Sequence, residues 1–186
     1  MSAWSYDGYS VQHWQAMVME AFIELYAGDG ARAFDRVQKD ERAAKRSFLL
    51  LGQFVRGTHG YIRGIAAVAA SQAGAGSRTE RLAEARKMAL KLEKEQMAWT
   101  APLAAIVSAG ASSAEGDGQS AAASLERAIE LALAADMSLY AAAAPASSRS
   151  ARRLVVVCSP RRTISKSRTA SADDLDVLAC VRRHRT

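Results

Sequence analysis

Large side chains are scarce in this sequence. Of its 186 residues only 12 are aromatic (3 Trp, 5 Tyr and 4 Phe), whereas 40 are alanine. Only three prolines interrupt the chain, Pro102, Pro145 and Pro160. Because alanine favours helices and is a poor strand former, this composition argues against all-β and α/β folds. We expect an all-α fold whose core consists of closely packed helices.

Long apolar runs and a secretory start are also missing. No stretch approaches the roughly 18 apolar residues of a transmembrane helix, and the opening MSAWSYDGYS has neither the basic residues nor the apolar segment of a signal peptide. We expect a soluble, cytoplasmic protein without a membrane span. Cysteine is limited to Cys158 and Cys180, which with His184 do not complete a four-ligand zinc site. No metal and no cofactor are expected.

The net charge of +6 is unevenly distributed. Residues 1–144 hold 15 Lys and Arg against 16 Asp and Glu, net −1, while residues 145–186 hold 10 against 3, net +7. We therefore expect a helical domain over 1–144 and a separate basic, Ser/Arg-rich tail over 145–186. The abrupt change in composition predicts that the tail is disordered or the product of a frameshift. The alternative is a basic arm that binds nucleic acid, although the tail offers no aromatic residue for base stacking.

Apolar residues recur at helical spacing through the first domain. The spacing predicts helices over about 10–27, 31–45, 47–70, from 77 onward, 102–113 and from after Gly118 to about Met137. The apolar positions expected on their faces are Val11, Trp14, Val18, Ala21, Phe22, Leu25, Phe34, Val37, Leu50, Phe54, Tyr61, Ile65, Val68, Leu82, Ala85, Ala89, Leu92, Ala122, Leu125, Ile129 and Ala132.

Four glycines, Gly52, Gly57, Gly60 and Gly64, lie within the third of these segments. Each costs about 0.5–1 kcal/mol relative to alanine in a helix interior. Either this helix is kinked, or a neighbouring backbone approaches it closely.

A repeated turn organises the domain. Gly28-Asp29-Gly30 and Gly116-Asp117-Gly118 each follow one helix and precede an alanine-rich one, and they are 88 residues apart, twice 44. Gly74-Ala75-Gly76 lies close to halfway. This pitch predicts three antiparallel helical hairpins that stack as a short right-handed solenoid, because a hairpin cannot bury its apolar face alone. The alternative is a six-helix bundle with a coincidental turn.

Several segments carry a family resemblance. The run Phe22–Asp29, the entry Ser47-Phe48-Leu49-Leu50, the segment Leu125–Ile129 and the ending Ala135–Ala142 resemble the tetratricopeptide-like (TPR-like) C-terminal region of large bacterial serine/threonine protein kinases and multidomain ATPase regulators. The resemblance covers about residues 10–144. Its pitch exceeds the 34 residues of the standard repeat, and the usual repeat signature is not met in order. It implies a protein-interaction or sensing region, attached in relatives to a kinase or ATPase module.

Catalytic motifs are absent from this chain. It has no kinase Gly-rich loop or catalytic-loop Asp with its Asn, no phosphate-binding loop and no Ser nucleophile elbow. His13 and His59 have no metal ligand at a suitable spacing, so we interpret both as structural histidines. We expect a non-enzyme with no catalytic, cofactor or metal residues, and no pattern selects the residues that bind a partner.

Three further patterns have competing interpretations. Arg78, Arg81, Arg86, Lys87, Lys91 and Lys94 form a basic run, but glutamates alternate with them and a solvated helix face is favoured over a nucleic-acid stripe. The segment 75–79 could bind an anion, although Ser77 and Glu80 are sufficiently explained as a helix cap. The aromatics Trp4, Tyr6, Tyr9 and Trp14 either cap the first hairpin or dock onto a preceding repeat.

The expected function is therefore docking of a protein or peptide in a groove between the hairpins' inner faces. Self-association through exposed end faces is a further expectation. The alternative function is that of a nucleic-acid-associated regulator that binds through the basic tail.

Overall fold

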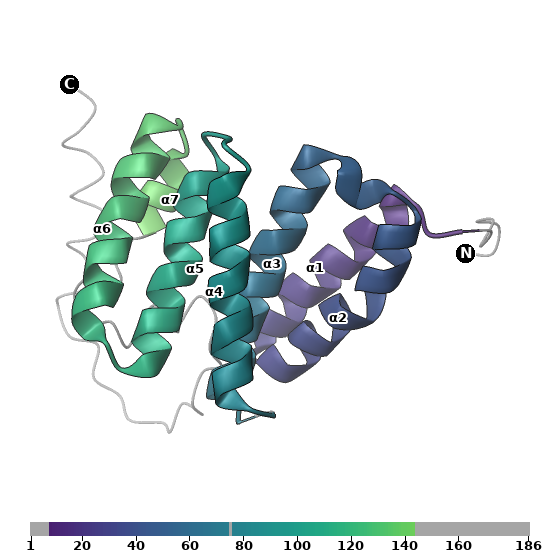
Figure 1. Cartoon of the computed structure of the whole chain (residues 1–186), viewed down its shortest axis with the longest axis horizontal. Coiled ribbons are helices and arrows are strands. Elements are labelled where there is room, and N and C mark those ends of the chain that lie inside the picture. Colours follow the sequence, from purple (N-terminus) through teal and green to yellow (C-terminus); the bar gives the residue numbers. More distant parts are fainter. Residues whose placement is uncertain (1–7, 75, 144–186) are drawn as a thin grey trace, which may run out of the picture.

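Helices form all of the regular structure in the part of the chain that is described (Figure 1). The computed structural model describes residues 8–74 and 76–143. Its helices are α1 (Val11–Ala27), α2 (Gly30–Arg46), the 3-10 turn η1 (Leu49–Leu51), α3 (Gln53–Gln72), α4 (Arg78–Lys94), α5 (Thr100–Glu115), α6 (Gly118–Ala134) and α7 (Ser138–Ala143). The expected all-α fold is confirmed over these residues. The expected tail, residues 145–186, lies outside them.

The two Gly-Asp turns have the same geometry, as predicted. Gly28 and Gly116 adopt left-handed backbone conformations, with φ of 83° and 91°, and end α1 and α5. The side chains of Asp29 and Asp117 then accept hydrogen bonds from backbone amides in the first turns of α2 and α6. Each turn therefore satisfies amides that a helix start leaves unpaired.

The third predicted helix begins later than expected. Ser47 ends α2, where its hydroxyl donates to the carbonyl of Ala44 at 3.0 Å, instead of opening the next helix. Phe48 then adopts a left-handed conformation (φ 60°), which breaks the helical path before η1. A bulky residue rarely takes this conformation, so apolar spacing alone gave no sign of the break.

The sixth predicted helix ends earlier than expected. It stops at Ala134, and Asp136 takes a left-handed conformation (φ 56°) before α7 begins at Ser138.

At the start of α4 the expected cap is confirmed, since the Ser77 hydroxyl accepts a hydrogen bond from the backbone amide of Glu80.

The core lies along α3, which packs against α1, α2, α4 and α5. Most of the apolar positions predicted for the core are buried, including Trp14, Val37 and Leu92. Four predicted positions are exposed, because they lie on the outer sides of their helices: Val11, Phe22, Phe54 and Ala122. Ile62, on the flank of the predicted face of α3, is fully buried because helices cover α3 on several sides.

Close approach, and not a kink, explains most of the glycines in α3, which is one continuous helix. A Cβ atom on Gly57 would lie 2.5 Å from the Trp99 ring, and one on Gly64 would lie 2.9 Å from Val107. The neighbours that fill these spaces are side chains. The closest backbone approach involves the first residue of α2, since a Cβ on Gly30 would lie 2.5 Å from the carbonyl carbon of Ala69.

Helices α2 and α4 lie on either side of α3 and diverge toward their C-terminal ends (Figure 1). Near their N-terminal ends they meet, since the Arg81 guanidinium lies 4.0 Å from the centre of the Phe34 ring. Farther along, α3 packs against both helices while α2 and α4 touch at few points. The space between the two C-terminal ends therefore remains open.

The outer side of α1 is apolar and exposed. Met19, Ile23 and Tyr26 recur at three- and four-residue spacing and are 58%, 66% and 88% exposed. Of the N-terminal aromatic residues, Trp14 is buried in the core and Tyr9 packs against it, while Trp4 and Tyr6 lie outside the described residues. None of the described helices combines the length and the apolar character needed to cross a bilayer.

The equivalent glycines of the two Gly-Asp turns provide a matched test of this packing. We expect Gly30→Ala to lower the free energy of unfolding by about 1–3 kcal/mol, because the new methyl group overlaps Ala69 and Ala70. Gly118 has no heavy atom near its would-be Cβ, so Gly118→Ala is expected to be neutral or to stabilise by up to about 1 kcal/mol. Urea denaturation of both variants measures the difference, and equal effects would contradict the close approach.

Candidate functional site

A cleft of about 410 Å³ occupies the space where α2 and α4 diverge, with α3 as its floor. We call it the α2–α4 cleft. Its lining residues are Glu41 and Lys45 from α2; Leu50 from η1; Arg56, His59, Gly60 and Arg63 from α3; and Met88, Lys91, Leu92, Lys94 and, just beyond the end of the helix, Glu95 from α4. Five of these side chains are Lys or Arg and two are Glu, so the lining is basic.

The floor follows from the spacing of α3. Arg56, His59, Gly60 and Arg63 are separated by three, four and seven residues, which places them on one side of a helix. An added Cβ at Gly60 would be in ordinary contact with the Leu92 side chain, 3.5 Å from its nearest atom. The polar residues of α3 thus face the opening.

Arg63 joins the two walls at the base of the cleft. Its guanidinium forms ion pairs with Glu41 of α2 and with Glu84 of α4, the latter with 2.7 Å between Nε and Oε1. Lys45 also contacts Glu41, at 2.9 Å. Burial alone would raise the pKa of Glu41, but the contacts from Lys45 and Arg63 lower it to about 2. Glu41 is therefore ionised at neutral pH and already occupied by two cations.

The second carboxylate of the lining is occupied as well. Arg56 binds Glu95 through both arms of its guanidinium, with 2.6 Å between Nη2 and Oε2. The hydrogen bond from Arg56 lowers the pKa of Glu95. The same guanidinium donates to the carbonyls of Leu50 and Leu51, at 3.2 and 3.0 Å, and so ties η1 to the end of α4.

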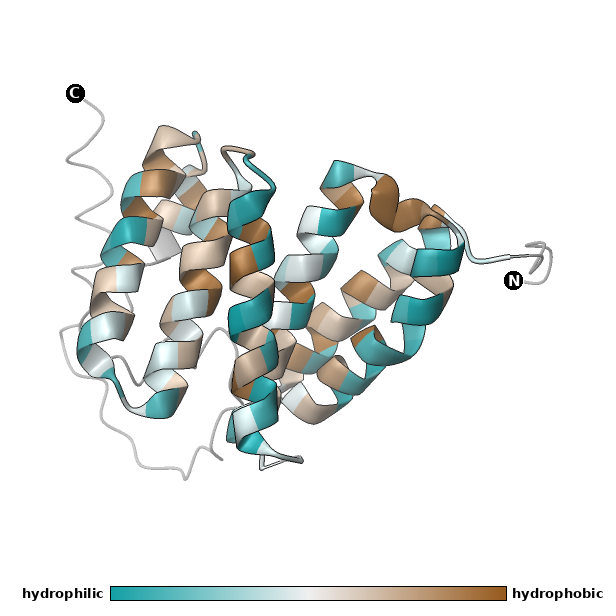
Figure 2. Cartoon of the chain, viewed as in Figure 1, coloured by the Kyte–Doolittle hydropathy of each residue, from teal (hydrophilic) through white to brown (hydrophobic). Residues whose placement is uncertain are grey.

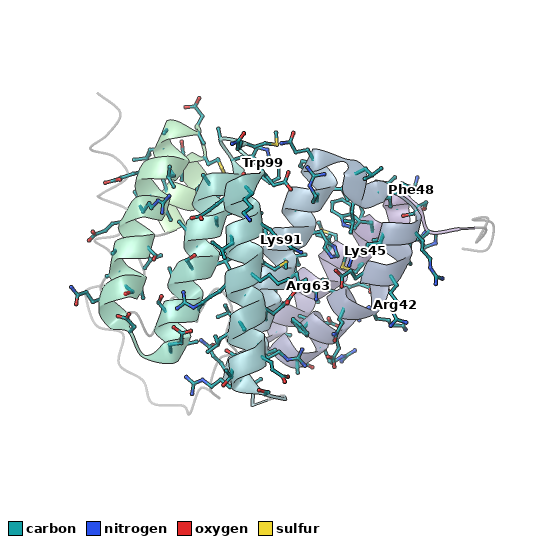
Figure 3. All side chains as sticks on the ribbon, in the orientation of Figure 1. Arg42, Lys45, Phe48, Arg63, Lys91 and Trp99 are labelled. Carbon is teal, nitrogen blue, oxygen red and sulfur yellow. The ribbon has the colours of Figure 1, made fainter. Side chains whose placement is uncertain are left out.

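Lys91 and Lys94 have no such partner. No carboxylate of the described residues lies within 4 Å of either ammonium group. Both belong to the last turns of α4, where the helix dipole favours positive charge. Figure 3 shows Lys91 on α4 and Lys45 on α2, with Arg63 between them. Lys91 and Lys94 thus give the cleft charge that the protein itself does not neutralise.

His59 is the most unusual residue of the floor. It is only 5% exposed, and neither ring nitrogen has a hydrogen-bond partner among the described residues. Burial lowers its pKa to about 4, with Arg63, Lys45 and Lys91 adding to the decrease and Glu41 opposing it. The ring is therefore neutral at neutral pH, with one N–H donor and one acceptor both unused.

Apolar residues gather at η1, whose ribbon is brown in Figure 2. Phe48, Leu51 and Phe54 are 72%, 73% and 64% exposed. Phe54 nevertheless contacts the rings of Trp14 and Trp99, with ring centres 6.4 and 5.8 Å apart. We call Phe48, Leu51 and Phe54 the η1 patch. Leu50, in the same turn as Leu51, lines the cleft, so the patch adjoins the cleft at this turn.

The basic run on α4 divides among several environments. Arg86 pairs with Glu115 of α5, Arg78 donates to the carbonyl of Ala114, and Arg81 lies over Phe34. Lys91 and Lys94 alone line the cleft, and Glu95, one turn from Lys91, pairs instead with Arg56. Five of the six basic side chains are exposed and Arg81 is partly buried, which agrees with the solvated face predicted from the sequence.

The other singled-out residues are not brought to the cleft. His13 packs on the Tyr9 ring, and its Nδ1 lies 2.7 Å from the Ser10 hydroxyl at the start of α1. Tyr9 donates to Asp40 at 3.3 Å, and burial together with this carboxylate raises its pKa. Within the described ranges, no three His, Cys, Asp or Glu side chains are placed to hold a metal ion.

Comparisons with protein-family models, with curated proteins and with solved structures find no match to this chain. Over residues 8–74 and 76–143 the fold is all-helical, with a basic cleft between two diverging helices. The resemblance to kinase-associated TPR-like regions stays a prediction.

The buried neutral His59 makes stability depend on pH. The pKa of His59 is about 6.5 in the unfolded chain and about 4 in the folded protein. The contribution of this residue to the free energy of unfolding is therefore fully present above about pH 6.5 and is lost as the pH is lowered toward 4. We expect a loss of about 2 kcal/mol between about pH 7.5 and pH 5 from this residue. Glu41 adds its own loss only at lower pH.

Urea denaturation at a series of pH values measures this loss. His59→Phe removes the titrating ring and is expected to flatten the curve over that interval. An unchanged slope in the variant shows that His59 is not the group responsible.

Proposed function

We propose that this chain is a non-catalytic interaction module that binds an acidic segment of a protein partner at the α2–α4 cleft. In this proposal the six long helices act as three stacked hairpins, a short TPR-like α-solenoid over residues 10–144. The observation that carries the proposal is the pair of unpaired lysines, Lys91 and Lys94, beside an open cleft whose own carboxylates are already occupied.

The η1 patch supports a protein partner in particular. Exposed apolar side chains next to a charged cleft provide the apolar and polar contacts that peptide segments use together. Phe48 supplies a ring that is 72% exposed at the edge of the patch. Acidic side chains of the partner would lie in the cleft while an apolar side chain packs on the patch.

Three further predictions concern an attached enzyme module, the alternative function and self-association. A link to a kinase or ATPase module, and a cytoplasmic location, follow from the resemblance and from the sequence. The nucleic-acid alternative depends on residues 145–186, outside the described residues. Self-association gains a specific surface in the exposed side of α1, formed by Met19, Ile23 and Tyr26.

Binding of labelled peptides to the full chain tests the proposal. The probes are a short fluorescein-labelled peptide of glutamates around one phenylalanine, and the same peptide with glutamines in place of the glutamates. We expect fluorescence polarisation to detect binding of the acidic peptide alone, weakening as salt is added. Binding of both peptides with equal affinity contradicts the proposal.

Charge reversals then locate the binding. Lys91→Glu is expected to lower the affinity for the acidic peptide by about tenfold or more, because it places a repulsive charge at the cleft. Lys39→Glu makes the same change on an exposed part of α2 that does not line the cleft, and is expected to have less than about a twofold effect. Equal effects of the two variants mean that the peptide responds only to net charge.

Phe48→Gly separates the patch from the fold. Glycine tolerates the left-handed conformation at this position, and the ring is mostly exposed, so the melting temperature is expected to stay the same or rise. Affinity for the acidic peptide is expected to fall several-fold because the apolar contact is lost. Leu133→Ala, at an exposed leucine of α6, is the control that leaves binding unchanged.

A further inference from the structure

The charge balance of the cleft distinguishes among possible anions. Its two carboxylates are each bound by guanidinium groups, and Lys91 and Lys94 remain without an anion. A carboxylate carries one negative charge, whereas a phosphate monoester carries about −1.5 to −2 at neutral pH. The two free ammonium groups together therefore match a phosphate monoester better than a single carboxylate.

The kind of donor that is free points the same way. Planar guanidinium groups bind carboxylates through two parallel hydrogen bonds, and Arg56 is already engaged in this way with Glu95. Arg63 makes one ion pair with each of Glu41 and Glu84. The donors left for a ligand are ammonium groups. These act as compact point charges and commonly bind phosphate.

His59 supplies a second, independent indication of a ligand. A buried polar group without a hydrogen bond destabilises the fold, and both nitrogens of this ring are in that state. His59 is one of the residues that line the cleft, and the charge of Lys91 contributes to the lowered pKa of its ring. An oxygen of a bound anion would accept a hydrogen bond from the ring N–H group and remove this destabilisation.

The size and the apolar wall of the cleft fit more than an isolated ion. A volume of about 410 Å³ lies in the range of small-molecule sites. Leu50, Met88 and Leu92 line the cleft beside the charged groups, and we call them the apolar wall. They can pack against the carbon part of a phosphate ester.

We propose that the α2–α4 cleft binds a phosphate monoester, with the phosphate between Lys91, Lys94 and His59 and the ester carbon on the apolar wall. The ester is either a free small molecule or a phosphorylated side chain of the protein partner. The inference rests on the proposed function for the second source only.

Calorimetric titration of the full chain with phenyl phosphate and with phenyl sulfate is the direct test. The two probes share a ring and a tetrahedral group, but at neutral pH phenyl phosphate is mostly dianionic and phenyl sulfate is monoanionic. We expect one-to-one binding of phenyl phosphate at least about tenfold tighter than that of phenyl sulfate. Equal affinities, or no binding of phenyl phosphate, overturn the inference.

Variants assign the site. The double variant Lys91→Ala and Lys94→Ala is expected to lower the affinity for phenyl phosphate by about tenfold or more. The control, Lys39→Ala with Arg46→Ala, removes two exposed cations of α2 that do not line the cleft, and is expected to leave the affinity within about twofold. An equal loss in both double variants overturns the assignment to the cleft.

His59→Phe tests the role of His59 in the floor of the cleft without changing a charged residue. It replaces the unpaired ring with an apolar one of similar shape, so stability at neutral pH is expected to be kept or increased. The affinity for phenyl phosphate is nevertheless expected to fall several-fold. Unchanged affinity in this folded variant contradicts the role of the His59 N–H group.

Peptide arms distinguish the sources and the two proposals. If a phosphoserine peptide displaces phenyl phosphate and binds more tightly than its glutamate counterpart, the ligand is a phosphorylated partner segment. If phenyl phosphate binds but no acidic or phosphorylated peptide does, the phosphate site stands with a free small molecule and the proposed partner function is wrong. If acidic peptides bind without any preference for phosphate, the proposed function stands and the phosphate inference is overturned.

Discussion

Close packing of the start of α2 on the end of α3 determines how the neighbouring helices are arranged. Only a glycine at position 30 allows this approach, because any larger residue would overlap the backbone of Ala69. The two helices are thus held together at one end by small residues. At the other end of α3 the side chains of Arg56, His59 and Arg63 face the opening, and α2 and α4 diverge there. The cleft follows from this gradient of side-chain size along a single helix.

The electrostatics of the cleft follow from which cations are already paired. Arginines bind the available carboxylates, link α2 and α4 to α3 and hold η1 in place, so they serve the structure. Lys91 and Lys94 contribute nothing comparable to the fold and remain at the surface. The neutral, unpaired His59 lies beneath them. The arginines thus stabilise the fold, while the two lysines and the histidine remain available to bind a ligand.

Much of the fold was predictable from the sequence because it depends on local signals. The Gly28-Asp29 and Gly116-Asp117 turns, the Ser77 cap and the apolar spacing of α4 each act within a few residues. The break at Phe48 was not predictable, since apolar spacing carries no sign that a bulky residue adopts a left-handed conformation. The close approach at Gly30 was not predictable either, because it involves a helix whose position no local pattern gives.

The cleft was missed because its parts come from three helices. Arg56, His59 and Arg63 do share one helical face in the sequence, and that spacing was the available signal. The sequence does not show, however, which cations are paired. That Arg63 pairs with Glu41 and Glu84 is seen only in the structure. Lys91 and Lys94 belong to the exposed face that the sequence predicts, but the pattern gave no sign that Glu95 pairs with Arg56.

The most direct test of the central claim observes the His59 ring itself as an anion enters the cleft. In long-range ¹H–¹⁵N spectra of the full chain, the account predicts that saturating phenyl phosphate shifts the ring nitrogens of His59, which gain a hydrogen-bond acceptor, and leaves those of His13 unchanged. Unchanged His59 resonances under saturating ligand, or equal shifts at both histidines, would contradict the account of the cleft as a binding site with His59 in its floor.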